Sequence, residues 1–355
     1  MSGPPFLQIN LAKEAMMSDR GSWILESTHS GFGTYDGSDE KRHVADNALI
    51  TSAAATETQY FGFNSPEYDI HGFTILWAHP AIGAASGGII AWQGHKTSQL
   101  ACEIYDYRGF MGEDIFVNDL HHVVMDSGVE HIIDEPLQRM RTRYRDDARG
   151  NALDLTYRAA SPPAMRVGNH HFEQGLKIEG EITLRGKTYP IDSYTVRDRS
   201  WGEARSEEPM PLPPLAWISG IFGDDFSFGC MSFEDSSRPV DWAEDFEMPP
   251  ESALKGGWIW YEGRMRSIVR ASRLTRRDPV TRQPMAHDMT LWDDSGEVFE
   301  LEGDIHATAP FTYWFNIDAM LGLIRWKCRG RTGCGDSQEA QWTDYVRSFI
   351  ARNPT

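Results

Sequence analysis

The sequence contains little cysteine. Four thiols occur in 355 residues, at Cys102, Cys230, Cys328 and Cys334, and no two of them form a Cys-x-x-Cys pair. A chain of this length can bury a core without disulfide bonds, and metal-binding cysteines are typically paired at close spacing. We therefore expect four reduced thiols, which is typical of a cytoplasmic protein.

The sequence also lacks a long apolar run. No segment reaches the roughly 18 consecutive apolar residues that a membrane-spanning helix needs. The N-terminal residues include Lys13, Glu14 and Asp19, in place of the apolar stretch of a signal peptide. These two absences predict a cytoplasmic location and no integral membrane association.

Basic residues are outnumbered by acidic ones. The 34 Lys and Arg residues face 52 Asp and Glu residues, which gives a formal net charge of −18. Such a surface repels phosphate backbones and anionic lipids. The composition therefore predicts that the chain binds no nucleic acid, and it favours a neutral, apolar small molecule as the partner.

Motifs for cofactors are missing as well. The sequence has no P-loop, no glycine-rich dinucleotide fingerprint, no Gly-x-Ser-x-Gly elbow and no His-Glu-x-x-His. Two pairs of adjacent histidines occur, His121-His122 and His170-His171. Neighbours on a strand point to opposite faces, so neither pair is suited to chelate one metal ion. We expect neither a metal nor any other cofactor.

What the chain has in abundance is aromatic residues and short strand-like runs. It contains 12 Trp, 12 Tyr and 17 Phe, which suit both cores and ligand cavities. From about residue 53 onward, apolar runs alternate with Gly, Pro, Asn and Asp, and no helical period persists. This pattern predicts an all-β fold of antiparallel barrels or sandwiches with few short helices, at 11–17 and 339–351. Exposed edges of such sheets allow a homodimer.

The length fits two domains. We predict a leader segment at residues 1–45, one β domain at 46–205 and a second at 206–355. The connector is the proline-rich stretch at Pro209, Pro211, Pro213 and Pro214, which suits neither a helix nor a central strand.

The segment 176–196 carries the clearest hairpin signal. Ile178, Ile182 and Leu184 alternate with acidic and polar neighbours, close to the period of two of a half-buried strand. Arg185-Gly186-Lys187 then predicts a tight turn into the following strand.

The end of this hairpin contains the strongest candidates for chemistry. On a regular strand Asp192, Tyr194 and Asp198 share a face, and a carboxyl in an apolar cavity becomes a proton donor near neutral pH. Trp201 follows, suited to stacking on a substrate or on a developing cation. Arg199 or Arg205 is expected to pair with Asp198. The alternative is an ion-paired corner at a barrel rim, plugged by Trp201.

The run from Phe172-Glu173-Gln174 to Arg197-Asp198-Arg199-Ser200-Trp201-Gly202 resembles the signature of the AttH / carotenoid 1,2-hydratase superfamily. The resemblance is specific over about 35 residues and extends more weakly over the rest of the chain. Arg199 stands where hydratase-like members often have His. The resemblance implies two consecutive lipocalin-like β domains and cofactor-free hydration, cyclisation or isomerisation of a hydrophobic, often isoprenoid, ligand.

The resulting hypothesis is an acid–base enzyme that acts on an unsaturated apolar molecule such as a terpenoid, a sterol or an aromatic catabolite. Asp198, Asp192 and Tyr194 are its catalytic candidates. The substrate-binding candidates are Trp201, Arg199, Arg205, Trp217, Trp258, Trp260, His171 and Glu173.

Other functions remain open. A carrier would need the cavity but no proton donor, and a scaffold would use the Trp-rich second half as an interface. A glycosidase would need two carboxylates close together, whereas Asp192 and Asp198 lie about 20 Å apart on an extended strand.

Overall fold

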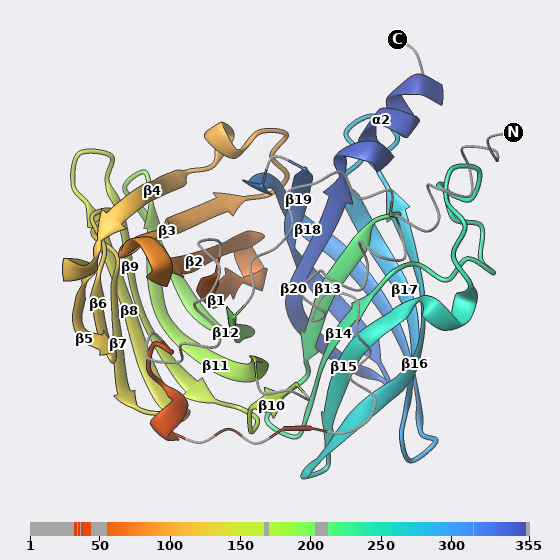
Figure 1. Ribbon diagram of the computed structural model, residues 1–355, viewed down its shortest axis with the longest axis horizontal. Coiled ribbons are helices and arrows are strands. Elements are labelled where there is room, and N and C mark those ends of the chain that lie inside the picture. Colours follow the sequence, from red (N-terminus) through yellow and green to blue (C-terminus); the bar gives the residue numbers. More distant parts are fainter. Residues whose placement is uncertain are drawn as a thin grey trace, which may run out of the picture.

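The computed structural model describes residues 32–33, 35, 37–43, 55–166, 170–202, 212–314 and 316–352. These residues form two antiparallel β units that lie side by side, a curled sheet and a closed barrel (Figure 1). The predicted all-β fold with two lipocalin-like units is therefore confirmed. The first unit differs from a barrel in that β4 and β5, at the two ends of its sheet, are not paired with each other.

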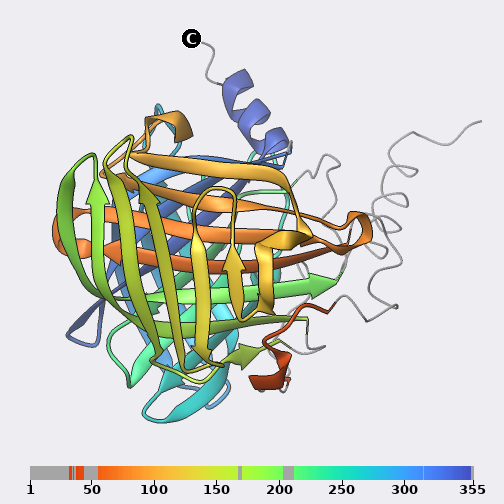
Figure 2. The ribbon, with the colours of Figure 1, turned by 90° about the vertical axis from the view of Figure 1, so that its left-hand side faces the viewer.

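The first unit is a sheet of twelve strands in the order β4-β3-β2-β1-β12-β11-β9-β8-β7-β6-β5, with β10 paired to β11. Its strands are β1 (Thr56–Ser65), β2 (Ile70–His79), β3 (Ala84–Gln93), β4 (Ile104–Gly112), β5 (Phe116–Leu120), β6 (His122–Val124), β7 (Glu130–Glu135), β8 (Arg139–Asp146), β9 (Asn151–Ala159), β10 (Ala164–Met165), β11 (His171–Leu184) and β12 (Lys187–Gly202). The orange strands of one end run across the yellow and green strands of the other (Figure 2). The sheet thus folds over its own apolar face.

The second unit is a barrel that closes in chain order from β13 to β20. Its strands are β13 (Leu215–Ile221), β14 (Phe226–Ser232), β15 (Leu254–Tyr261), β16 (Arg264–Arg277), β17 (Pro284–Asp293), β18 (Val298–Trp314), β19 (Ile317–Cys328) and β20 (Arg331–Trp342). Helix α2 (Thr343–Arg352) follows β20 directly. The helix predicted at 339–351 therefore begins later than expected, because residues 339–342 continue the last barrel strand.

Short 3-10 turns connect several strands. They are η2 (Gly37–Asp39), η3 (Pro66–Tyr68), η4 (Pro80–Ile82), η5 (Gln99–Ala101), η6 (Glu113–Ile115) and η7 (Pro250–Ser252). The helix predicted at 11–17 and the prolines at 209 and 211 lie outside the described residues, as does most of the predicted leader.

Two turns show why the chain reverses where it does. Arg185 and Gly186 both have positive φ, 50° and 83°, between β11 and β12. This is the geometry of a two-residue hairpin loop whose twist matches the strands, and it confirms the predicted turn. Arg329 and Gly330, with φ of 51° and 72°, make the same kind of reversal between β19 and β20.

Three buried apolar clusters hold the molecule together. One fills the curled sheet and includes Phe61, Leu155 and Ile178. A second fills the barrel. The third belongs to both units, since Tyr60 and Phe73 of the sheet pack with residues of β18, β19 and β20. We call this boundary between the two units the seam. Side chains of both units pack together along the seam. Figure 1 shows β1, β2 and β3 beside β18, β19 and β20.

In the described part of the chain, no helix has the length and apolarity needed to cross a bilayer. The four cysteines are buried and free.

Candidate functional site

The register of three strands, β1, β12 and β11, places a row of polar side chains on the seam face of the sheet. Tyr60 on β1 is opposite Asp198 on β12, and Asp198 is opposite Glu173 on β11. Directly opposed residues of antiparallel strands project from the same face. Tyr60 is part of the seam cluster, so this Tyr60–Asp198–Glu173 row faces the barrel.

A second polar row lies one step further along the same strands. Ser200 on β12 is opposite Thr58 on β1 and His171 on β11. Because this row is two residues removed from the first, its side chains emerge on the same face. The two rows bring His171, Glu173 and Ser200 together at the end of the seam.

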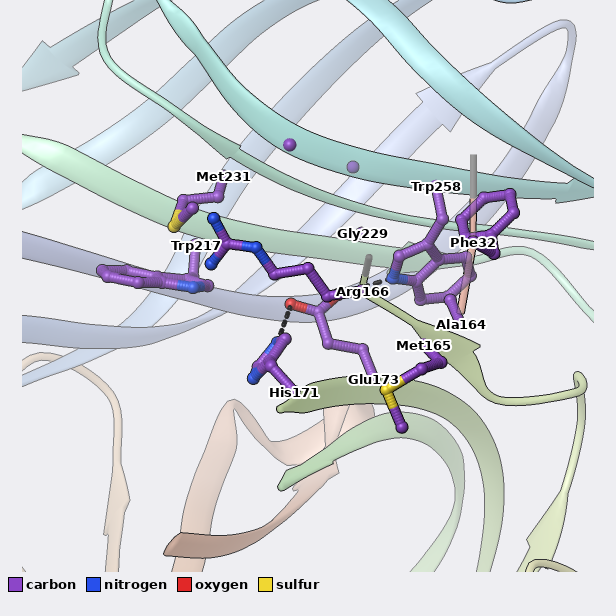
Figure 3. Close-up of a pocket in the computed structure, with 12 residues that line it drawn as sticks. Phe32, Ala164, Met165, Arg166, His171, Glu173, Trp217, Gly229, Met231 and Trp258 are labelled. Carbon is purple, nitrogen blue, oxygen red and sulfur yellow. Dashed lines mark hydrogen bonds and ion pairs between the residues drawn. The ribbon is translucent and has the colours of Figure 1, made fainter. Parts of the chain in front are cut away.

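A pocket opens at this place between the two units (Figure 3). From the first unit come residues of β10 and β11, and from the barrel residues of β13, β14 and β15. Its lining consists of Phe32, Ala164, Met165, Arg166, His171, Glu173, Trp217, Gly229, Met231, Gly256, Gly257 and Trp258. The cavity volume is about 40 Å³, which is room for a few water molecules. A larger ligand therefore requires the lining side chains to move apart.

Glu173 is the centre of the polar contacts in this pocket. Trp258 Nε1 donates a hydrogen bond to Glu173 Oε2 at 2.5 Å, from the barrel across the seam. His171 Nε2 lies 3.5 Å from Glu173 Oε1. On its other side, His171 Nδ1 shares a hydrogen bond of 2.7 Å with Ser200 Oγ. The carboxyl is thus fixed by an indole N–H and faces an imidazole that is itself oriented by a hydroxyl.

Gly229 makes the contact between Glu173 and Trp258 possible. A Cβ atom at position 229 would lie 2.2 Å from Glu173 Oε2 and 2.5 Å from Trp258 Nε1. Both distances are well below van der Waals contact, so a side chain here would displace the carboxyl. Because Gly229 on β14 has no side chain, the Glu173 carboxyl can occupy the space beside it.

The remaining walls of the pocket are mainly apolar. In Figure 3, Trp217 and Met231 lie on one side of the Glu173–His171 pair, and Phe32 lies on the other side beside Trp258. Arg166 is buried and adds a positive charge, its guanidinium drawn next to Met231. The pocket is mainly apolar and contains one carboxyl, that of Glu173, and two basic groups, those of His171 and Arg166. This composition is typical of a small-molecule site.

The predicted catalytic residues separate into two groups. Asp198 lies beside Glu173 in the register, on the seam face. Asp192 is exposed and pairs with Lys177, and Tyr194 donates a hydrogen bond to Asp224 at 3.2 Å. Both line a surface groove with Arg325 and His306, far along β12 from the pocket. The fold therefore brings Asp198 near Glu173 and leaves Asp192 and Tyr194 away from it.

Arg199 and Trp201 are part of the packing of the first unit. Arg199 donates to the carbonyls of Asp39 and Lys41 and lies 3.4 Å from Glu57. The expected pairing of Arg199 with Asp198 is corrected by these contacts, because adjacent residues of β12 project to opposite faces.

Trp201 is buried, stacks on His43 with ring centroids 4.2 Å apart, and packs with Phe172. These contacts match the alternative interpretation, a locked corner, better than an open binding surface. Arg205 lies outside the described residues.

Among the other substrate-binding candidates, Trp217, Trp258, His171 and Glu173 line the pocket. Trp260 does not, since two residues further along β15 its Nε1 donates to the carbonyl of Asp224.

Sequence reasoning missed Arg166, Met231 and Gly229. Arg166 and Met231 stand in no recognisable motif, and Gly229 became informative only when the strand opposite it was known. Within the described ranges, no group of three or more His, Cys, Asp or Glu side chains is arranged to hold a metal ion.

Comparisons with known proteins agree with this architecture. The model of a family described as "Domain of unknown function (DUF7064)" matches residues 36–344. No curated protein matches the sequence. Among solved structures, a protein described as an AttH from Nitrosomonas europaea is similar with a TM-score of 0.53 and 14% identity, covering 90% of this chain and 99% of that one.

Two further solved structures share the same fold. CghA, solved with Sch210972, has a TM-score of 0.52 and 10% identity, covering 92% of this chain and 98% of its own. Kievitone hydratase from Nectria haematococca has a TM-score of 0.50 and 11% identity, covering 91% of this chain and 99% of its own. Identities this low establish the fold alone. They confirm the AttH-like architecture predicted from the 170–205 segment.

Proposed function

The chain belongs to the DUF7064 family, and on that premise we propose that it is a hydratase, cyclase or isomerase that acts by acid–base chemistry on a hydrophobic, unsaturated small molecule in the seam pocket. The reaction as proposed uses side chains of this chain only. Terpenoids, sterols and aromatic catabolites are the substrate classes that fit an aromatic and methionine-lined wall.

One observation carries the proposal. Glu173 lies in a largely apolar pocket between an indole N–H at 2.5 Å and an imidazole at 3.5 Å. A carboxyl that is oriented by one donor and adjacent to a second titratable group is suited to give and recover a proton. Trp217 and Trp258 present rings in the same pocket, and ring faces stabilise a developing cation.

In the proposed reaction, one proton leaves Glu173 and one returns to it. A protonated Glu173 transfers its proton to one carbon of a double bond, so a C–H bond forms and the neighbouring carbon becomes cationic. Water or an internal nucleophile then bonds to that carbon. The proton released by the nucleophile returns to Glu173, directly or through His171, and the site is restored.

The neighbouring structures support this reaction class without establishing it. Kievitone hydratase is named for the addition of water, and CghA was solved with a small organic molecule, Sch210972. Both share the two-unit architecture that forms the seam.

The alternative is a carrier that binds a hydrophobic metabolite without changing it. Met165 and Met231 in the pocket wall also suit a carrier, because thioether side chains adapt to many ligands. A carrier would not need the Glu173–His171–Ser200 arrangement.

The experiment is native mass spectrometry of the protein after incubation with a panel of terpenoids, sterols and aromatic catabolites, with recovery and identification of the bound molecule. A product that differs from the added compound by one water, or by rearrangement at equal mass, supports the enzyme. A ligand recovered unchanged by both the wild type and Glu173→Gln after long incubation would replace the enzyme with the carrier.

A further inference from the structure

A second carboxyl reaches into the seam from the barrel. Asp336 on β20 is 1% exposed. Its Oδ2 accepts hydrogen bonds from the hydroxyls of Tyr60 at 3.3 Å and Thr195 at 3.4 Å, both on the sheet. This side chain therefore crosses from one unit into the other.

The sheet leaves a space for this carboxyl at Gly62 on β1. A Cβ at position 62 would lie 2.4 Å from Asp336 Oδ2 and 2.4 Å from Thr195 Oγ1. The absence of a side chain there admits Asp336, just as Gly229 admits Glu173.

Within the described part of the chain, no Lys or Arg side chain forms an ion pair with Asp336. Among the described residues, the only ion-pair partner within reach is His71, whose Nδ1 lies 3.9 Å from Asp336 Oδ1. That oxygen and both ring nitrogens of His71 are buried without a hydrogen-bond partner. An ionised carboxylate here would lose its hydration and gain only two long hydrogen bonds from hydroxyls in return, so burial favours the neutral acid.

The buried acid lies directly behind the pocket row. Its hydrogen-bond donor Tyr60 is opposite Asp198, and Asp198 is opposite Glu173. Both carboxyls adjoin Tyr60, Asp198 by strand register and Asp336 by a hydrogen bond, so we expect a negative charge on Asp198 to act on Asp336 across the buried seam. Such coupling is reciprocal, so a charge on Asp336 acts equally on Asp198.

We propose that Asp336 is a positioning residue of the seam pocket, a buried carboxyl that stores one proton behind Asp198 and thereby controls how readily Asp198 takes up or releases its own. The role of Asp336 in turnover rests on the proposed function. The stored proton and its coupling to Asp198 are independent of that function.

The titration behaviour of the surroundings supports this role. Burial raises the pKa of Asp336 to about 7, the charge of Asp198 raises it as well, and the hydroxyls of Tyr60 and Thr195 act in the opposite direction. Burial lowers the pKa of His71 to about 3, so its ring is neutral at pH 7. The titratable groups that face Asp336 are Tyr60 on β1, His71 on β2, Tyr157 on β9, Asp198 on β12 and Cys334 on β20.

The first test is infrared spectroscopy of the whole protein in heavy water. A protonated carboxyl has a carbonyl stretching band that carboxylates lack. We expect a band in the difference between the wild type and Asp336→Asn at pH 5.5, and its loss by pH 9. The absence of this difference band at pH 5.5, with the variant folded, would overturn the proposal.

The coupling is tested by two further variants with the same readout. In Asp198→Asn the midpoint of the Asp336 band should move to lower pH, because a like charge is removed. In Tyr60→Phe it should move to higher pH, because a hydrogen bond to the carboxylate is removed. Midpoints that stay unchanged in Asp198→Asn would reduce Asp336 to a structural group and refute the positioning role.

Thermal unfolding gives an independent measurement. If the pKa of a carboxyl is higher in the folded state than in the unfolded state, its ionisation destabilises the fold. This destabilisation is absent at pH values below the pKa of the unfolded state and complete above the pKa of the folded state. The melting temperature of Asp336→Asn minus that of the wild type should therefore increase as pH rises from 4 to 8. A constant difference across this range contradicts the stored proton.

Once a substrate is known, Asp336→Asn should shift the pH profile of kcat with little change in KM. An unshifted profile would refute the role in turnover. Failure to find any turnover would bear on the proposed function alone, because the infrared midpoints are measured without substrate.

Discussion

Glu173 and Asp198 are neighbours across two strands, yet their surroundings differ. Glu173 contacts Trp258 and His171 in the pocket, whereas Asp198 lies between Glu173 and Tyr60 in the row. Asp198, a catalytic candidate from the sequence, stays a predicted participant, and we propose Glu173 as the proton donor because its contacts place it in the pocket.

The first prediction concerns Glu173 itself. Glu173→Gln keeps the shape and the acceptor for Trp258 but removes the transferable proton, so turnover should fall by about 10²–10⁴-fold. Substrate conversion followed by mass spectrometry measures this. The matched control is Glu179→Gln on the exposed part of the same strand, which should convert substrate as the wild type does. Retained turnover in Glu173→Gln would move the proton transfer to another group.

Gly229 provides a second prediction at the same scale. Gly229→Ala should displace the Glu173 carboxyl, since the added carbon lies 2.2 Å from its Oε2, and should destabilise the fold by about 1–3 kcal/mol. Chemical unfolding and ligand binding measure the two effects. Gly109→Ala is the control, since a Cβ there meets no atom within 4 Å. Equal stability and equal ligand binding of the two variants would show that the side chains around position 229 can move to accommodate the added carbon.

At the scale of elements, the barrel contains a buried ion network between β16 and β20. Glu339 on β20 lies 2.8 Å from Arg277 and 3.5 Å from Arg273, both on β16. Arg277 also pairs with Glu234. These strands are not neighbours in the barrel, so the network joins opposite walls of its interior.

The network predicts a defined loss of stability in acid. Burial disfavours the ionised form of Glu339, but the charges of Arg277 and Arg273 outweigh it and lower its pKa to about 2, from 4.5. A depressed carboxyl pKa stabilises the fold above the unfolded value, and the stabilisation disappears as pH falls from about 4.5 towards 2. We expect a loss on the order of a few kcal/mol in urea unfolding between pH 5 and pH 2.5.

Glu339→Gln is the variant that checks this interpretation. It leaves Arg277 and Arg273 buried without this partner and should cost about 3–5 kcal/mol at pH 7. Its stability should also depend less on pH below 5. An acid transition as steep as that of the wild type would assign the effect to other carboxyls.

At the scale of the molecule, the seam makes the two units dependent on each other. Phe311 on β18 packs against Phe73, with ring centroids 5.5 Å apart, and against Tyr107 at 5.9 Å. Both partners belong to the sheet. The units therefore should unfold in one cooperative transition.

Phe311→Ala tests this dependence. Loss of a buried ring should cost about 3–5 kcal/mol and separate the calorimetric transition into two, one for each unit. Phe110→Ala is the control, because Phe110 is 75% exposed and its removal leaves no cavity. A single, unshifted transition in Phe311→Ala would show that the seam contributes little to stability.

The sequence by itself determined the fold class and several local features. Strand alternation around Ile178 and the Arg185-Gly186 turn depend on contacts within a few residues, so their pattern is visible in the chain. The AttH-like architecture was also predictable, because the 170–202 segment forms one hairpin whose residues are contiguous. Four of the eleven candidate site residues, His171, Glu173, Trp217 and Trp258, line the seam pocket, and their role there stays a prediction.

Only the tertiary structure decided which carboxyls meet in the seam. Glu173 and Trp258 are far apart in sequence, and so are Tyr60 and Asp336. Their meeting depends on the register of β1, β11 and β12 and on how the barrel packs against that face. The sequence pattern of one strand predicts only that Asp192, Tyr194 and Asp198 project from the same face of the sheet. Which part of that side is covered by the barrel, and which is left to solvent, is set by packing between units that local sequence does not encode.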